Sequence, residues 1–236
     1  KRNYQSLIPA DLCRVQEAMS ELQTKHKQIY GNDAKLISDD GWCEVWKYEN
    51  DNGKTEMWYI VDCEEGAELI YGFKDKLTKE QFRAAIADNT LLEYVNRVPV
   101  KRGDVFFIKP GTLHAIGKGI LIAEIQQSSN VTYRVYDYGR LGADGKPREL
   151  HVEKAIEVTS LDPSPEQQTN GAENIGGSVS VQKLASCEYF DVEKYEIGGG
   201  ELRLENRADS FRHILVIDGE CEVFCGGEQG LTAKKG

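Results

Sequence analysis

The chain has 236 residues, which is enough for one large domain or two small ones with a sizeable hydrophobic core. Its formal net charge is −10 and it has no basic tract, so we expect neither nucleic acid nor a membrane surface as a partner. No apolar run approaches the length of a membrane span, and the first residues show no signal-peptide pattern. The six cysteines include no CxxC pair. Cysteines without such a pairing pattern indicate reduced thiols. Because thiols stay reduced in the cytoplasm, we expect a cytoplasmic protein.

The first part of the chain combines a helix with the start of a β region. Residues 10–30 carry apolar side chains at helical spacing, which predicts a helix. The stretches WCEVWKYE (42–49) and KTEMWYIVD (54–62) have the composition of strands. Asn52-Gly53 lies between them and is a strong hairpin signal.

A helical segment then interrupts the strands. After a further strand, AELIYGF, Thr78 and Gln81 have the spacing of a capping box, which predicts a helix over 78–88. TLLEYVNRV (90–98) predicts a second short helical piece. HVEKAIEV, further along, predicts a short helix as well. The strands predicted between these pieces are VKRGDVFFIK, GILIAEIQ and VTYRVYDYG.

The second half of the chain follows a polar stretch. Residues 162–177 are rich in turn formers and mark the clearest linker or domain boundary. Five short strands separated by Gly turns are predicted beyond it: SVQKLA, YFDVEKYEI, ELRLEN, SFRHILVIDGE and CEVFCGG. The whole pattern predicts a mostly β protein, a sandwich or a barrel, with a few helices.

One histidine stands at a position that suits a metal ligand. The stretch GDVFFIKPGTLHAIGKG (103–119) places His114 just after a turn, between two apolar runs. A strand–turn–strand unit can direct this side chain into the mouth of a barrel, where neutral imidazole is a good ligand for zinc or iron. The residues alone leave a second interpretation open, a hydrogen-bonded histidine at the barrel rim.

Two carboxylates interrupt apolar strands. Alternation along GKTEMWYIV places Glu56 on the same strand face as Trp58. A carboxylate among large apolar side chains is costly to bury unless it is paired or bound to a cation. Glu56 therefore either has such a partner or lies on an exposed face of a hairpin. Glu124 follows an apolar run in GILIAEIQQ, so it lies at a strand end or has a partner inside.

Three basic residues accompany these groups. Lys54 lies two residues before Glu56, and Arg134 and Arg140 lie six residues apart in VTYRVYDYGR. Guanidinium groups suit phosphate through bidentate hydrogen bonds, and a lysine is a point charge that suits a phosphate or an enediolate oxygen. Each residue alone is an ordinary surface charge. Together with a histidine and a glutamate of metal-binding type, they fit an anionic sugar.

Three stretches of the chain, taken in order, carry a family resemblance. GKTEMWYIVD, GDVFFIKPGTLHAIGKG and ILIAEIQQSSNVTYRVYDYGR resemble the type I mannose-6-phosphate isomerases, zinc enzymes of the cupin superfamily. Gly103, Pro110, Gly111 and His114 also match the general second cupin motif. The resemblance is dense over 52–158. It is looser in the second half, where SFRHILVIDGECEV is similar to the start of a second cupin barrel.

The resemblance implies a fold and a domain organisation. We expect a mostly β fold, with a cupin double-stranded β-helix (jelly-roll) barrel, a few helices and a second, smaller cupin-like barrel. The N-terminal helical or irregular segment is expected over 1–41, and the catalytic cupin domain over 42–161 with a helical insert at 78–97. A C-terminal cupin-like β domain is expected over 178–236. Because the chain ends at LTAKKG, before closing strands, we expect this second barrel to be incomplete.

The resemblance also implies an activity and its residues. The family interconverts mannose 6-phosphate and fructose 6-phosphate by metal-assisted proton transfer through a cis-enediol, so a hexose phosphate is the expected substrate. One Zn²⁺ per chain is expected, in a monomer or a homodimer. The positions that match the family's are Glu56 and His114 for the metal, Lys54, Glu124 and Arg140 for substrate binding, and Arg134 for catalysis.

The sequence departs from the family at two metal ligands. No Q-x-H-P motif, whose glutamine and histidine bind zinc in the family, precedes Glu56. Three explanations stay open: the chain omits a segment, Cys43 or Glu44 replaces the missing ligands, or the protein is a catalytically weakened cupin that binds a sugar phosphate as a sensor or regulatory module. We interpret His26, on an apolar helix face, and His213, in the second barrel, as structural.

Overall fold

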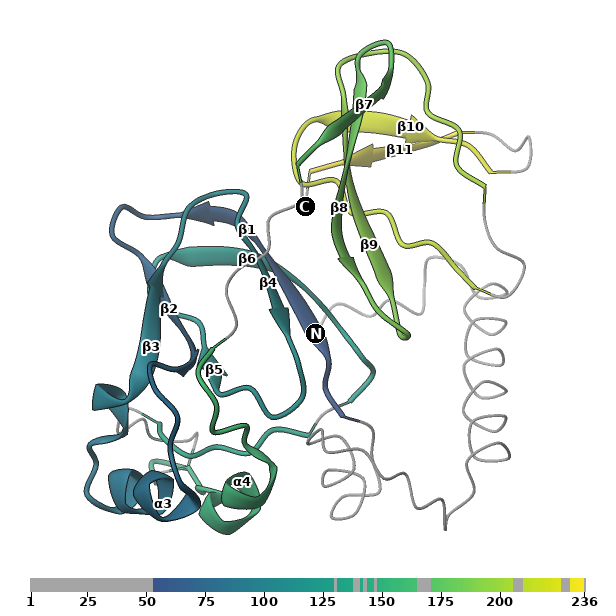
Figure 1. The fold of residues 1–236 in the computed structure, drawn as a ribbon. Coiled ribbons are helices and arrows are strands. Elements are labelled where there is room, and N and C mark those ends of the chain that lie inside the picture. Colours follow the sequence, from purple (N-terminus) through teal and green to yellow (C-terminus); the bar gives the residue numbers. More distant parts are fainter. Residues whose placement is uncertain are drawn as a thin grey trace, which may run out of the picture. The chain divides into compact units, whose positions relative to one another are not determined.

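The computed structural model of the chain describes residues 53–129, 131–137, 141, 144–146, 148–164, 171–205, 210–225 and 230–235. Over these residues the protein is mostly β, with two α-helices and one 3-10 turn among short antiparallel strands (Figure 1). The mostly β class predicted from the sequence is therefore confirmed. The predicted helix over 10–30, the predicted strand over 42–49 and Asn52 of the hairpin turn lie outside the described residues.

Three antiparallel strands form the sheet that carries the predicted metal ligand Glu56. Strand β1 (Glu56–Cys63) lies between β4 (Val105–Ile108) and β6 (Ile120–Gln126). All three coincide with predicted strands. Their β-branched and aromatic side chains fit a pleated, largely buried surface, which is why composition alone locates them.

Both faces of β1 are covered by other parts of the chain. On one face Trp58 packs with Phe106 of β4. On the other face Met57 packs in a cluster with Ala185 of β8 (Val179–Ser186), a strand from the second half of the chain. A strand buried on both faces reads as a nearly continuous apolar run, as EMWYIV does. A carboxylate at the start of such a strand therefore lies in an apolar surrounding.

A second sheet carries His114. Strand β2 (Glu68–Phe73) lies between β3 (Val95–Pro99) and the two-residue β5 (His114–Ala115). The second helical piece predicted over 90–98 is wrong except for one 3-10 turn, η2 (Leu91–Glu93). The β-branched residues after this turn pair with β2 instead, so sheet pairing overrides the weak local helical pattern.

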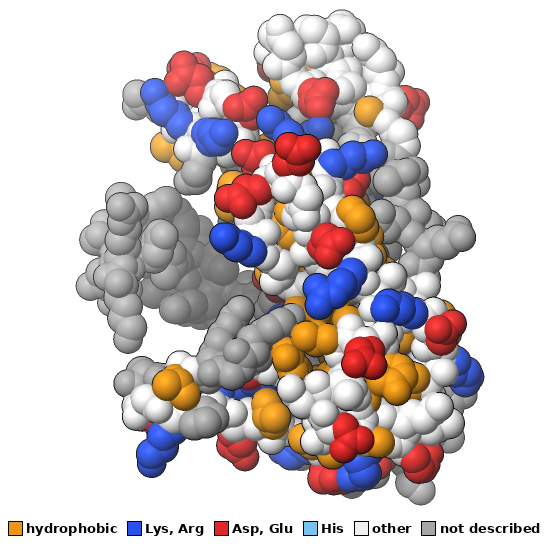
Figure 2. Space-filling view, turned by 90° about the vertical axis from the view of Figure 1, so that its left-hand side faces the viewer, with side chains coloured by type: hydrophobic (Ala, Val, Ile, Leu, Met, Phe, Trp, Pro, Cys, Tyr) orange, Lys and Arg blue, Asp and Glu red, His pale blue; other side chains and the backbone are white. Residues whose placement is uncertain are grey.

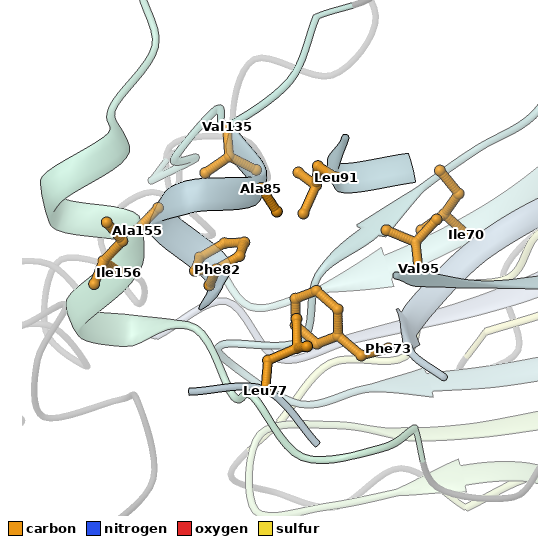
Figure 3. Packing of buried hydrophobic residues seen from close by; sticks show 10 residues of the cluster. All are labelled: Ile70, Phe73, Leu77, Phe82, Ala85, Leu91, Val95, Val135, Ala155 and Ile156. Carbon is orange, nitrogen blue, oxygen red and sulfur yellow. The ribbon is translucent and has the colours of Figure 1, made fainter. Parts of the chain in front are cut away.

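Two helices pack on each other beside this sheet. Helix α3 (Lys79–Ala87) begins with the predicted capping box: the Thr78 hydroxyl accepts from the Gln81 amide at 3.2 Å, and the Gln81 side chain accepts from the Thr78 amide at 2.8 Å. Helix α4 (Val152–Val158), also predicted, lies against it. Phe82 of α3 is fully buried at the centre of their shared apolar cluster (Figure 3). These contacts stabilise the segments that flank the site.

The strand predicted at VTYRVYDYG is wrong for the part that the structure describes. Residues 131–137 form no strand. The backbone of Arg134 instead bonds to His151: the His151 amide donates to the Arg134 carbonyl at 2.7 Å, and the Arg134 amide donates to the His151 Nδ1 at 3.2 Å. Because these groups are satisfied by the residue before α4, the segment does not join a sheet ladder.

The described part of the second half contains five strands, of which three coincide with predicted ones. Strands β7 (Glu173–Gly176), β8 and β9 (Asp191–Ile197) form one antiparallel sheet, and β10 (Glu220–Val223) pairs with β11 (Leu231–Lys234). The three that coincide with predicted strands are β8, β9 and β10. Strand β7 occupies the end of the stretch 162–177, which was predicted as a linker or domain boundary, so residues 173–176 are a strand and not part of a linker.

Two further predicted strands of the second half are absent from the described residues. No strand forms over 201–205 or 210–217, the described parts of ELRLEN and SFRHILVIDGE. Several of their apolar side chains are exposed, among them Phe211 and Leu215, and gain no cross-strand partner. Composition predicted strands here, but cross-strand packing, which stabilises a sheet, is missing.

Two further features of the described residues are the distribution of charge on one face and the apolar length of the helices. Acidic and basic side chains are interspersed over the face drawn in Figure 2. Among the described residues, no helix is both long and apolar enough to cross a membrane.

One glycine ties the turn before His114 to the end of α4. Gly111 has a φ of +83°, a conformation that L side chains rarely adopt. Its carbonyl accepts a hydrogen bond of 2.9 Å from the Ser160 amide. A Cβ atom at Gly111 would lie 2.5 Å from the carbonyl oxygen of Val158. The glycine of the cupin motif is therefore required for both its backbone conformation and this close approach.

We expect Gly111→Ala to lower the free energy of unfolding by about 2–4 kcal/mol, because backbone strain and a backbone clash add. Gly66→Ala is the matched control, since Gly66 has a similar φ of +76° with nothing within 4 Å of the added Cβ. The control should show the cost of the strain alone. Urea unfolding of both variants measures the difference, and equal losses would contradict the clash.

Candidate metal and substrate site

The register of the first sheet gathers polar side chains on one face. Glu56 lies opposite Gln126, and Trp58 lies opposite Glu124. Directly opposed residues of antiparallel strands point to the same side of the sheet. Lys54, just before β1, reaches over this face. The prediction that Glu56 and Trp58 share one strand face is thus confirmed.

A lysine pairs with both carboxylates. The Lys54 Nζ lies 2.9 Å from the Glu56 Oε1 and 3.5 Å from the Glu124 Oε1. The Glu56 side chain is 1% exposed, whereas that of Glu124 is 33% exposed. The interpretation of Glu56 as a surface residue of a hairpin is therefore wrong. Glu124, for its part, has a partner inside the site, in agreement with one of the two alternatives predicted for it.

The two carboxylates differ in proton affinity. Burial, and then the hydrogen bond with Glu124, raises the pKa of Glu56 to about 7, although Lys54 opposes this shift. Burial also acts to raise the pKa of Glu124, but its hydrogen bond with Glu56 and the charge of Lys54 outweigh this and lower it. Burial makes negative charge on this pair of carboxylates unfavourable. A positive charge placed beside them is therefore favourable.

His114 presents one free ring nitrogen to this cluster. Its Nδ1 lies 2.7 Å from the carbonyl oxygen of Thr112, which accepts from it, so the Nε2 carries the lone pair. The Nε2 lies 3.7 Å from the Glu56 Oε1. Burial lowers the pKa of His114, the hydrogen bond to Thr112 raises it, and Lys54 lowers it further. The net shift favours neutral imidazole, which is the form that binds metals.

Glu56 and His114 fit two positions around a divalent cation. Two ligands of a tetrahedral zinc lie about 3.4 Å apart, close to the 3.7 Å between the Glu56 Oε1 and the His114 Nε2. The buried Oε1 lies 2.9 Å from the Lys54 Nζ, and among the described residues it accepts no hydrogen bond of regular geometry. Within these same residues, no third His, Cys, Asp or Glu completes a cluster. The proposed replacements Cys43 and Glu44 lie outside the described residues, as does His26.

Two cavities meet at His114. The first, of about 150 Å³, is lined by Lys54, Glu56 and His114 together with residues 109–113, 131–133, 135 and 158–159. The second, also of about 150 Å³, is lined mainly by apolar side chains and by Arg134. Because His114 lines both cavities, the cavity that Arg134 lines adjoins the one that Glu56 lines.

The predicted arginines are not brought into the carboxylate cluster. The Arg134 Nη1 donates to the Glu149 carbonyl at 3.3 Å, and its Nε lies 3.8 Å from Asp137. Arg134 therefore approaches the site only as a wall of the second cavity. Arg140 lies outside the described residues. His213 is exposed on a segment without regular structure and lines neither cavity.

Sequence reasoning overlooked two residues that orient the site. Trp58 donates from Nε1 to the Glu56 Oε2 at 3.2 Å, and Thr112 orients His114. Each has a simple signal, because Trp58 follows Glu56 by two residues on the same strand face and Thr112 precedes His114 by two.

Known proteins provide the comparison. No protein-family model matches the chain. Mannose-6-phosphate isomerase ManA of Bacillus subtilis is 39% identical over 92% of this chain and 73% of its own length. The mannose-6-phosphate isomerase of Streptococcus mutans is 35% identical over 92% of this chain and 72% of its own length. The chain belongs to the mannose-6-phosphate isomerase family. This confirms the family resemblance carried by the three sequence stretches.

Solved structures agree with this assignment. The crystal structure of the Bacillus subtilis mannose 6-phosphate isomerase superposes with a TM-score of 0.73 at 30% identity, over 92% of this chain and 73% of that one. A phosphomannose isomerase variant of Salmonella typhimurium superposes with a TM-score of 0.52 at 13% identity, over 93% of this chain and 67% of that one, which shows likeness of fold alone. The predicted mostly β cupin class is thereby confirmed.

We expect Lys54→Met to lower the free energy of unfolding by about 1–3 kcal/mol in chelator-treated protein, because it leaves a buried carboxylate without its cation. Lys79→Met is the matched control: Lys79 pairs with Glu157 at 3.1 Å on the exposed surface of the helix pair, where ion pairs contribute little. Urea unfolding at pH 7 measures both. A loss at Lys54 no larger than that at Lys79 would show that the site does not depend on this cation.

Proposed function

We propose that the chain interconverts mannose 6-phosphate and fructose 6-phosphate by moving a proton between C1 and C2 through a cis-enediol. The observation that carries this proposal is the buried Glu56 carboxylate, held between Lys54 and His114 at the edge of a cavity. Such a constellation is costly to a protein that does not use it, because a buried carboxylate must be compensated. Its occurrence in a chain 39% identical to a mannose-6-phosphate isomerase supports an isomerase function.

Zinc is the cofactor that we assign to this site, one ion per chain, with Glu56 and His114 as two of its ligands. A buried carboxylate and a neutral imidazole with a fixed tautomer are donors that zinc commonly takes. When bound, the ion supplies Lewis-acid polarisation of the carbonyl and the adjacent hydroxyl of the sugar.

The side chains of the chain supply the other functions. Lys54, which pairs with both carboxylates, can turn one of its three donors to a substrate oxygen while still neutralising Glu56. Glu124 is one-third exposed and accepts a hydrogen bond from a sugar hydroxyl. Arg134, on the wall of the second cavity, stabilises the negative charge that develops on the sugar as the proton leaves carbon.

The phosphate needs a cationic binding position in an acidic chain. The net charge is −10, so long-range attraction does not favour an anionic substrate and local contacts must do so. We assign Arg140 to the phosphate, because a guanidinium binds phosphate oxygens in a bidentate manner.

The four described cysteines form no disulfide, which supports a location in the cytoplasm. Cys63, Cys187, Cys221 and Cys225 are free thiols. Exposed free thiols are typical of a reducing compartment, and we therefore place the protein in the cytoplasm.

We expect purified protein to hold one equivalent of zinc and to form fructose 6-phosphate from mannose 6-phosphate in a coupled assay. His114→Ala should lose the metal and lower kcat/KM by at least about 100-fold, because it removes a zinc ligand and the polarisation that zinc supplies. His213→Ala is the control and should keep both, because His213 is exposed and lines neither cavity. Metal analysis and the assay, together with circular dichroism, measure the effect.

The outcomes separate an isomerase from a binding module. Zinc with turnover supports the isomerase. Mannose 6-phosphate binding without turnover supports the alternative, a catalytically weakened cupin that acts as a sensor, which the missing Q-x-H-P motif favours. Neither metal nor turnover in folded protein would overturn the isomerase proposal.

We expect Arg134→Gln to lower kcat about 100–1,000-fold, because it removes an electrostatic contact to charge that develops only in the transition state. Zinc content should not change, since Arg134 lies on the second cavity and not beside Glu56. Arg83→Gln is the control, because Arg83 pairs with Glu153 on the exposed surface between α3 and α4. A variant at Arg134 with unchanged kcat and raised KM would assign this residue to substrate binding instead.

A further inference from the structure

One indole ring touches both proposed metal ligands. The Trp58 Nε1 donates a hydrogen bond of 3.2 Å to the Glu56 Oε2. The same ring meets the His114 ring edge to face, with centroids 5.2 Å apart and an interplanar angle of 82°. Trp58 itself is 3% exposed, and its body packs in the apolar cluster with Phe106. It is therefore a buried side chain that contacts both proposed ligands.

The two contacts fix different degrees of freedom. The hydrogen bond to Oε2 sets the rotation of the Glu56 carboxylate, so that Oε1 is the oxygen directed to Lys54 and His114. The ring contact limits rotation of the His114 imidazole, whose other edge is held by its bond to the Thr112 carbonyl. The 3.7 Å separation of the Glu56 Oε1 from the His114 Nε2 is thus set from both sides by one side chain.

We propose that Trp58 is a positioning residue that holds Glu56 and His114 in the relative orientation needed to share one cation. This inference rests on the proposed function, because it takes Glu56 and His114 as ligands of the same ion. Partners that orient metal ligands commonly change metal affinity 10–100-fold when they are removed. The competing interpretation is that Trp58 is a core residue whose contacts with the ligands have no effect on binding.

The experiment compares two variants of the same apolar cluster. Trp58→Phe keeps an aromatic ring and removes the N–H donor. Tyr71→Phe is the matched control: Tyr71 is also buried in this cluster, and its hydroxyl donates to a backbone group, the Phe107 carbonyl, at 2.8 Å. Trp58→Phe removes one hydrogen bond and part of the indole ring, whereas Tyr71→Phe removes one hydroxyl, so the stability of each metal-free variant is measured beside its Zn²⁺ affinity.

Zn²⁺ affinity is measured on the full chain by competition with a chromophoric chelator, and the ligand field by the absorption spectrum of bound Co²⁺. Urea unfolding after chelation measures stability without metal. We expect Trp58→Phe to weaken Zn²⁺ binding about 10–100-fold and to alter the Co²⁺ spectrum. Tyr71→Phe should leave both unchanged.

Three results would overturn the inference, and they differ in what else they overturn. Unchanged Zn²⁺ affinity in Trp58→Phe, with His114→Ala still abolishing binding, rejects the role of Trp58 and leaves the proposed function intact. Equal weakening in Trp58→Phe and Tyr71→Phe rejects it as well, because the effect then follows core stability. If the unsubstituted chain binds neither Zn²⁺ nor Co²⁺, the metal-dependent function and the role of Trp58 fail together.

A second measurement decides the matter if Trp58→Phe does not fold. The indole N–H resonance of Trp58, assigned with Trp42→Phe and Trp46→Phe, should shift on addition of Zn²⁺ and stop shifting at one equivalent. A resonance that does not respond, in protein that has taken up the metal, shows that the indole is not coupled to the metal site and overturns the inference.

Discussion

The structure around the site depends on one buried carboxylate. Glu56 is 1% exposed at the start of a strand that is covered on both faces. Leaving such a group ionised without compensation costs more than a typical side-chain contact contributes. Its neighbours are arranged to reduce this cost, with the Lys54 ammonium at one oxygen and the Trp58 N–H at the other. A divalent cation between Glu56 and His114 would complete this compensation.

The burial of Glu56 goes together with a strand, β1, whose two faces are both apolar. β1 packs through Trp58 on one face, while Met57 and Tyr59 on the other face meet side chains of β8 and β9. Glu56 is 1% exposed, and this burial raises its pKa and strengthens its interaction with a cation. The strands from the second half of the chain thus contribute to the site without lining it.

The sequence predicted those parts of the site that are set by residues close together along the chain. Glu56 was marked by a carboxylate in an apolar alternating strand, and His114 by a strand–turn–strand unit. The wrong strand predictions depend on partners that composition does not reveal: the Arg134 backbone bonds to His151, 17 residues away. Residues 210–217 have apolar side chains but form no strand, and Ile217 packs on the cluster of Met57 and Tyr59 instead. The contact of Trp58 with His114 joins residues of two different sheets, and no spacing rule predicts it.

The position of His114 is set by the helices as much as by the sheets. β5 has only two residues and pairs with β2 through Tyr71 and Ile70, which is too little to fix a side chain. The turn before it is held by the bond from Ser160 to Gly111, just after α4, and Leu113 packs on the cluster that α3 and α4 share. The helical core therefore helps to hold the backbone that carries His114, a proposed metal ligand, while the first sheet carries Glu56 and the Trp58 ring that contacts both. Loss of packing between α3 and α4 would change the Glu56–His114 separation without touching either residue.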